Sequence, residues 1–102
     1  MRIADVYYEN LMAGQLIEIE NNRDYRFVYD PRYVGPPISQ TMPVRKEEYS
    51  FKMLPPFFDG LLPEGFQLEA LLRRMKLDRY DTFGQLLTVG GDTVGAVTVR
   101  AH

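Results

Sequence analysis

The run PPFFDGLLPEG at residues 55–65 separates two halves of the chain that differ in pattern. Proline is tolerated in the first turn of a helix, so Pro55 and Pro56 predict a short helix over residues 57–62 that ends near Pro63. Before the run, apolar and polar residues alternate roughly as in strands; after it, the apolar spacing is helical. The run therefore marks the boundary between a strand-rich half and a helix-rich half.

Two further helices are expected after this boundary. Over residues 64–75 four apolar residues fall at i, i+3, i+4 and i+7 and predict one buried stripe: Leu68, Leu71, Leu72 and Met75. Asp81 and Thr82 can cap a third helix that runs to about Val89, because Gly90 and Gly91 follow as a stop signal.

The first half predicts an antiparallel sheet. Strands are expected over residues 2–8, 14–20 and 25–29, with a connection over 9–13 and a turn over 21–24. Residues 38–44 are expected to be extended, 45–48 to form a solvated charged turn, and 93–100 to form a closing strand. The fold class is therefore α+β: a small, mostly antiparallel sheet packed with about three short helices from residues 55–90, in one domain spanning 1–102.

Composition excludes several classes of protein. The 102 residues include no cysteine, so a disulfide or a thiolate metal site is excluded. The formal net charge of -2 gives no support for direct binding to nucleic acid, which usually shows a basic surface. No apolar run approaches the ~20 residues that cross a bilayer, and the first residues are not a signal peptide, so we expect no membrane contact and a cytoplasmic location.

Catalytic chemistry finds little support in the sequence. The single histidine, His102, is the terminal residue, and Ser39 and Ser50 have no plausible histidine partner. The run GGDTVG at residues 90–95 precedes an expected strand and so lacks the helix N-terminus that binds phosphate. The carboxylates show no metal-ligand spacing with histidine or cysteine. We expect no enzyme activity, no cofactor and no metal.

Three other groups of residues are expected to be structural or solvated. Glu18 and Glu20 stand two apart on one strand and are predicted to be solvated. Asp59 is expected on a helix surface or bonded to nearby backbone. The aromatic residues of the strands and of the first helix are expected in the core: Tyr7, Tyr8, Phe27, Tyr29, Phe57 and Phe58.

Phe66 is the candidate binding residue. At 100° per residue it lies about 160° from the centre of the predicted stripe on the helix over 64–75, close to Ala70 and Arg73. Such an aromatic is either an exposed anchor for a partner or is covered by the neighbouring loop, as in a staple contact. Aromatic residues and arginine are enriched among interface hot spots, so the candidate partner-binding set is Phe66, Ala70 and Arg73.

Five segments in order resemble one known family. FFDGLLPEG at 57–65 and GGDTVGAV at 90–97 are similar to the F-F-D-N-L-L-P-E-G and G-x-D-x-V-G-A patterns of the N-terminal subdomain of HipA-type bacterial kinases. Weaker likeness comes from VYYEN with GQL (6–10 and 14–16), FVYDP (27–31) and ISQTMPV (38–44). Gly60 stands where Asn is common, and Gln40-Thr41 replaces Leu-Ser.

The resemblance implies a function through a partner. Because the kinase lobes are absent, a separate chain of this length looks like HipS, the antitoxin of three-gene HipBST modules. In these modules the small protein inhibits a shortened serine/threonine kinase, HipT, and a third protein, HipB, binds DNA. The alternatives are an N-terminal subdomain excised from a full-length HipA-like kinase, with a structural role only, and a co-repressor that reaches DNA through a basic partner.

Overall fold

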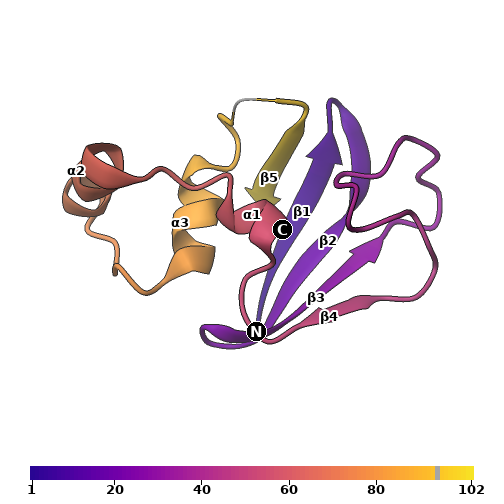
Figure 1. Ribbon diagram of the computed structural model, residues 1–102, viewed down its shortest axis with the longest axis horizontal. Helices are drawn as coiled ribbons and strands as arrows, with labels where there is room; N and C mark the ends of the chain where they lie inside the picture. The colour runs from indigo at the N-terminus through magenta and orange to yellow at the C-terminus, as the bar shows by residue number, and fades with distance from the viewer. Residues whose placement is uncertain (94) are drawn as a thin grey trace.

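Five antiparallel strands form one sheet in the order β4-β3-β2-β1-β5, and the chain also contains three helices, of which α2 stands away from the sheet (Figure 1). The computed structural model describes residues 1–93 and 95–102. In chain order the elements are β1 (Arg2–Tyr8), β2 (Leu11–Glu20), β3 (Arg23–Tyr29), β4 (Tyr49–Phe51), α1 (Pro56–Asp59), α2 (Gly65–Met75), α3 (Thr82–Val89) and β5 (Val97–Ala101). The expected α+β fold is confirmed, with its antiparallel sheet and three helices.

The first and last strands lie side by side. β1 pairs with β2 on one edge and with β5 on the other, and Ala4 stands opposite Ala101 in the β1–β5 ladder. Side chains alternate across a strand, so one face of this sheet receives the apolar set that faces the helices. The fully buried strand residues of that set are Ala4, Val6, Leu16, Phe27 and Val99.

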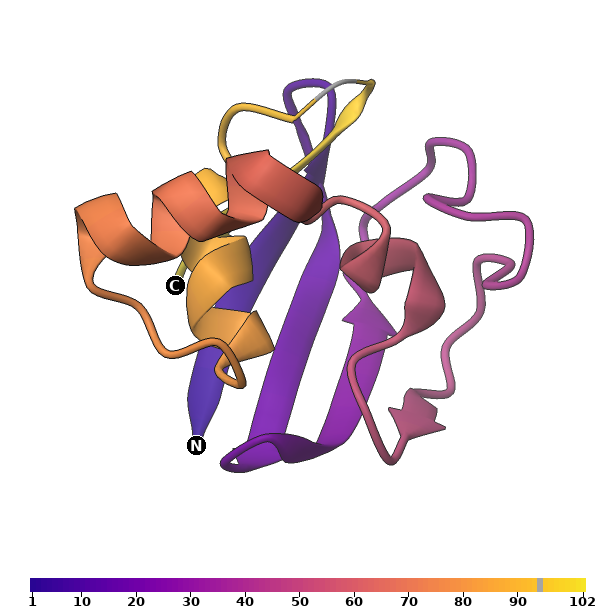
Figure 2. The same cartoon turned by 60° about the vertical axis from the view of Figure 1, so that its left-hand side comes forward.

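α1 and α3 cover one face of the sheet (Figure 2). Phe58 of α1 and Phe83 of α3 are fully buried there. Phe58 lies 5.9 Å from Phe27 between ring centroids, and Phe83 lies 6.2 Å from Tyr25. The predicted core role is confirmed for Phe58, Phe27 and Tyr29. Tyr8 and Phe57 are half-buried and pack against this core, whereas Tyr7 is half-buried outside it.

A buried ion pair ties β1 and β2 to the start of α3. Glu18 is 2% exposed and accepts hydrogen bonds from Arg2 Nε at 2.7 Å and from the Tyr25 hydroxyl at 3.2 Å. Arg2 also bonds Asp81, the N-cap residue of α3, at 2.7 Å. The prediction that Glu18 is solvated is therefore wrong: its side chain points into the covered face, where Arg2 balances its charge. Glu20, two residues further along β2, is exposed as expected.

This network changes the acid–base behaviour of its members. The hydrogen bond that Arg2 donates lowers the pKa of Asp81, and the bonds that Asp81 and Glu18 accept raise the pKa of Arg2. Burial, with the negative charge of Glu18 next in importance, raises the pKa of Tyr25 to about 12. Asp81 also accepts the backbone N–H of Gly84 at 3.1 Å, so the predicted helix cap is confirmed.

The strand boundaries differ from expectation in five places, one of which is that β3 begins at Arg23 rather than Tyr25. β2 begins at Leu11 rather than Gly14, because Glu9 adopts a left-handed conformation (φ 54°) and closes a tight turn. β4 was not predicted, and residues 38–44 contain only an isolated bridge between Ser39 and Met42. The closing strand is Val97–Ala101, shorter than the expected 93–100, and Val94 lies outside the described residues.

The helices follow the predicted positions more closely. α1 is shorter than the expected 57–62, whereas α2 and α3 begin and end within a residue of expectation. Among the residues that the structure describes, no helix combines the length and apolar character needed to cross a membrane.

Candidate partner-binding face

α2 stands at one end of the molecule, away from the sheet (Figure 1). Leu71 and Leu72 are buried as predicted, and Leu68 is half-buried. Met75 was predicted to share this stripe, and that is wrong, since its side chain is 49% exposed. It lies in the last turn of α2, which extends beyond α3 (Figure 2), and about half of its surface stays in contact with solvent.

Phe66, Ala70 and Arg73 form one exposed face of α2, which we call the α2 outer face. Their spacing of i, i+4 and i+7 places them on one side of the helix, opposite Leu71 and Leu72. All three are exposed, and the Phe66 side chain is 94% exposed. The structure thus brings the three sequence-predicted residues together and selects the exposed alternative for Phe66, because no loop covers it.

The local sequence fixes the direction of Phe66. Glu64 is extended (φ -129°), and Gly65 has a positive φ of 58°, a conformation that glycine adopts without steric cost. The chain therefore turns sharply into the helix just before Phe66. A Cβ at Gly65 would meet no atom within 4 Å, so backbone conformation and not space favours glycine here.

Two charged residues of α2, Glu69 and Arg73, stand at i+3 and i+7 from Phe66, on the same side of the helix. Glu69 and Arg79 form an ion pair at 2.7 Å that links α2 to the loop before α3, and the hydrogen bond from Arg79 lowers the pKa of Glu69. Arg73 takes part in none of the ion pairs formed among the described residues. The α2 outer face thus offers an exposed aromatic ring and an exposed cation, Arg73, whose charge also helps to lower the pKa of Glu69.

Sequence reasoning missed a second apolar surface on the helical side. Met53 and Tyr80 are 73% and 76% exposed and border a cleft of about 380 Å³. Asp59 lies on its edge, exposed as a helix-surface residue. Because Met53 and Tyr80 lie in loops, no hydrophobic periodicity could have identified them.

The residues weighed for catalysis lie apart. His102 contacts Asp5 at 3.0 Å on the β1–β5 side, whereas the Ser39 hydroxyl lies 2.9 Å from Thr41 in the loop before β4. The glycine-rich run begins at the end of α3, with Gly90 as its C-cap, and leads into β5. It therefore precedes a strand, as predicted.

Comparison with known proteins agrees with this architecture. The family model described as HipA N-terminal domain matches residues 4–100. The chain belongs to the HipA N-terminal domain family. A solved structure described as the N-terminal domain of HipA toxin is similar with a TM-score of 0.73 and 26% identity, covering 100% of this chain and 93% of that chain.

Two relatives show the domain in different settings. An uncharacterized protein of Haemophilus influenzae is 32% identical over 91 residues, which cover 87% of this HipA N-terminal domain chain and 86% of that protein. A putative kinase of Sinorhizobium fredii, Y4mE, is 29% identical over 101 residues, which cover 95% of this chain but only 24% of the kinase. Similar sequences thus make up most of a short protein and about a quarter of a long one.

Proposed function

We propose that this chain is a non-enzymatic antitoxin subunit that binds a HipT-like serine/threonine kinase and inhibits it. Membership of the HipA N-terminal domain family and the similarity to part of a putative kinase support an association with kinases. The similarity to a short protein of Haemophilus influenzae supports action as a separate chain. The observation that carries the proposal is the α2 outer face, where Phe66 is 94% exposed on a structured helix.

The physical basis is burial of Phe66 in the kinase. An exposed aromatic side chain contributes about 2–3 kcal/mol when it is fully buried, and such residues dominate many interfaces. Arg73 lies on the same face and can pair with a carboxylate of the kinase. A subdomain that packs on the kinase in fused homologues can pack there as a separate chain and restrict lobe closure or nucleotide access. Inhibition then depends on the concentration of the small protein.

Two partners follow from this proposal. The first is the HipT-like kinase, bound directly. The second is a HipB-like DNA-binding protein, reached through the complex, because the net charge of -2 disfavours direct contact of this chain with DNA. The three proteins would act together in the cytoplasm.

A second candidate function is a structural role as the N-terminal part of a complete HipA-like kinase. The similarity to 24% of Y4mE favours it. Reading the gene beyond codon 102 separates the two: a stop codon supports the antitoxin, and an open frame supports the kinase subdomain. In either case the pure chain is expected not to hydrolyse ATP.

The test is the substitution Phe66→Ala with the neighbouring kinase gene co-expressed. We expect the variant to melt within a few degrees of the wild type and to lose rescue of growth. Its affinity for the purified kinase should fall by about thirtyfold, which corresponds to about 2 kcal/mol. The matched control is Tyr80→Ala, which removes another exposed aromatic side chain and leaves the α2 outer face unchanged.

Two results would contradict the proposal. A Phe66→Ala variant that is stable and still rescues growth would show that the α2 outer face is not the contact surface. Absence of any complex between the wild-type chain and the kinase would refute the antitoxin function itself.

A further inference from the structure

The segment between β3 and β4, residues 30–48, is long for a connection without helix or strand. Loops of this length in compact domains are usually functional or disordered. Here tyrosine hydroxyls hold the chain in place: Tyr29 accepts the backbone N–H of Ile38 at 3.1 Å and donates to the carbonyl of Met42, and Tyr33 donates to the carbonyl of Pro36. The loop therefore presents a fixed surface.

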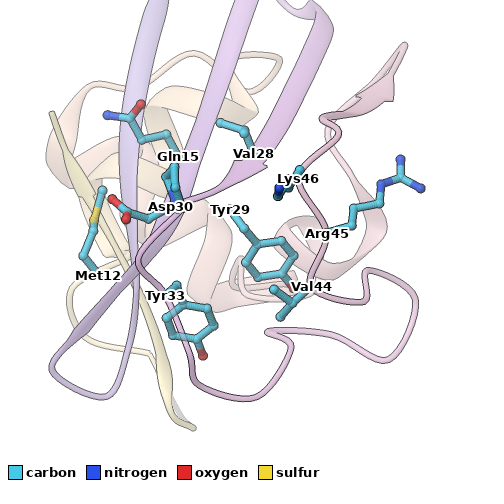
Figure 3. Close-up of a pocket in the computed structure, with 11 residues that line it drawn as sticks. Met12, Gln15, Val28, Tyr29, Asp30, Tyr33, Val44, Arg45 and Lys46 are labelled. Atoms are coloured by element: carbon cyan, nitrogen blue, oxygen red, sulfur yellow. The ribbon is translucent and has the colours of Figure 1, made fainter.

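A cleft of about 480 Å³ lies between this loop and the end of β3 (Figure 3). We call it the loop cleft; Met12, Val28, Tyr29, Tyr33 and Val44 form its apolar part, and Asp30, Arg45 and Lys46 lie along its edge. The volume falls within the range of preformed ligand pockets. The cleft is therefore large enough to take a ligand with an apolar group.

The strand pairing explains why the cleft is open. The ladder between β3 and β4 ends where Phe27 meets Tyr49, but β3 continues to Tyr29. Past that point the chain at residues 44–46 lines the other side of the cleft. Strand edges recognise extended peptides by adding one more strand, so the geometry favours an extended polypeptide segment as the occupant.

The charges on the edge favour an acidic occupant. Asp30 is balanced by Arg32, whose backbone N–H and guanidinium lie 2.8 Å and 3.5 Å from its carboxylate. The Arg45 guanidinium stacks on the Tyr49 ring at 3.6 Å and donates to backbone carbonyls. Lys46 takes part in none of the ion pairs formed among the described residues. Among the described residues, neither Arg45 nor Lys46 thus has a carboxylate within 4 Å, although Glu47 and Glu48 follow them directly in the sequence.

We propose that the loop cleft binds an extended segment of a second polypeptide in which an apolar side chain is adjacent to carboxylates. The apolar side chain fills the space between Val28, Tyr33 and Val44, and a carboxylate pairs with Lys46. Two cations on a chain of net charge -2 are too few for a nucleic-acid surface.

This site is separate from the proposed kinase contact. α2 and the 30–48 loop lie at opposite ends of the longest axis of the molecule, which measures 39 Å (Figure 1). A segment in the loop cleft therefore leaves the α2 outer face free. The chain could bind two polypeptides at once, one at each end.

The experiment selects peptides from a phage-displayed library of random dodecapeptides on the folded wild-type chain. The enriched peptides are synthesised, and their binding is measured by fluorescence anisotropy. We expect an apolar residue beside Asp or Glu in the enriched sequences. Lys46→Glu should weaken binding at least tenfold, and Val44→Asp should do the same. The control Lys52→Glu, which makes the same charge change at an exposed residue outside the cleft, should leave affinity unchanged. Melting curves confirm that each variant is folded.

Four results of the peptide selection and binding measurements would overturn the proposal. They are the absence of any enriched peptide, enrichment of basic peptides, equal affinity for wild type and Lys46→Glu, and loss of binding in Phe66→Ala. The last would place the peptide on the α2 outer face. Competition by a random single-stranded oligonucleotide at the same site would instead assign the cleft to nucleic acid and refute the peptide assignment.

Discussion

Neutralising Glu18 is expected to destabilise the fold strongly, although the sequence alone suggests a harmless surface change. Glu18 accepts hydrogen bonds from Arg2, Tyr25 and the backbone N–H of Asn22. Breaking a buried ion pair by removing one partner typically costs about 3–5 kcal/mol. In a Glu18 variant, Arg2 keeps its ion pair with Asp81 at 2.7 Å, and its side chain is one-third exposed, so the cost is reduced. We therefore expect about 3 kcal/mol for Glu18→Ala and about 2 kcal/mol for Glu18→Gln, which keeps the shape but loses the charge.

Urea unfolding followed by far-UV circular dichroism measures this loss. Urea slopes for small domains are about 1–3 kcal/mol per molar, so a loss of about 2 kcal/mol should lower the midpoint for Glu18→Gln by about 0.7–2 M. Glu20→Gln is the matched control, because Glu20 lies on the same strand in an exposed ion pair with Arg23. Exposed pairs contribute about 0–1 kcal/mol, so its midpoint should barely move. Equal midpoints for Glu18→Gln and Glu20→Gln would refute the assignment of Glu18 as a buried charge that the fold requires.

Three other predictions concern stability. Leu71→Ala should lower the free energy of unfolding by about 2–4 kcal/mol, because Leu71 is 4% exposed. Met75 is 49% exposed, so Met75→Ala should lower it by less than about 0.5 kcal/mol. Equal melting temperatures for the two variants would contradict the orientation of α2. Gly14→Ala should destabilise by about 1–3 kcal/mol, since a Cβ there would lie 2.2 Å from the Val28 carbonyl oxygen; an unchanged urea midpoint would argue against the close approach of β2 and β3. The pKa of Tyr25 is raised from an ordinary 10.0 to about 12 in the folded protein, so folding favours the neutral phenol. This preference adds about 3 kcal/mol to the free energy of unfolding below pH 10, and the contribution is lost as pH rises toward 12. Between pH 10 and 12 the urea midpoint should fall less steeply with pH for Tyr25→Phe than for wild type. An equally steep fall in both proteins would contradict the raised pKa of Tyr25.

Local patterns predicted the elements whose signals lie within a few residues. The alternation in residues 2–8 and 25–29, the apolar spacing around Leu71 and the capping residue Asp81 each depend on neighbours in the sequence. The exposure of Phe66 could be anticipated as one of two alternatives from its angle to the stripe. Its role toward a partner stays a prediction.

Tertiary contacts decided the features that the sequence did not predict. The partner of Glu18 is Arg2, 16 residues away, and Arg2 in turn reaches Asp81, 79 residues away. β4 has only three residues and depends on pairing with Tyr25–Phe27, so its own sequence has little strand signal. Met75 fits the helical stripe, but whether a stripe is buried depends on what lies opposite, and at the end of α2 about half of Met75 stays exposed.

The pairing of β5 with β1 sets the order in which the chain can fold. During synthesis the first strand leaves the ribosome early, whereas β5 (Val97–Ala101), the other strand that pairs with β1, appears only after all three helices have been made. Until then one edge of β1 is open to misplaced pairing with other chains. A short chain that ends soon after β5 completes its sheet only on release from the ribosome. In a long kinase the same strand is free while the remainder is still being translated. Separate and fused forms of this domain therefore differ in the time for which an unfinished sheet is exposed.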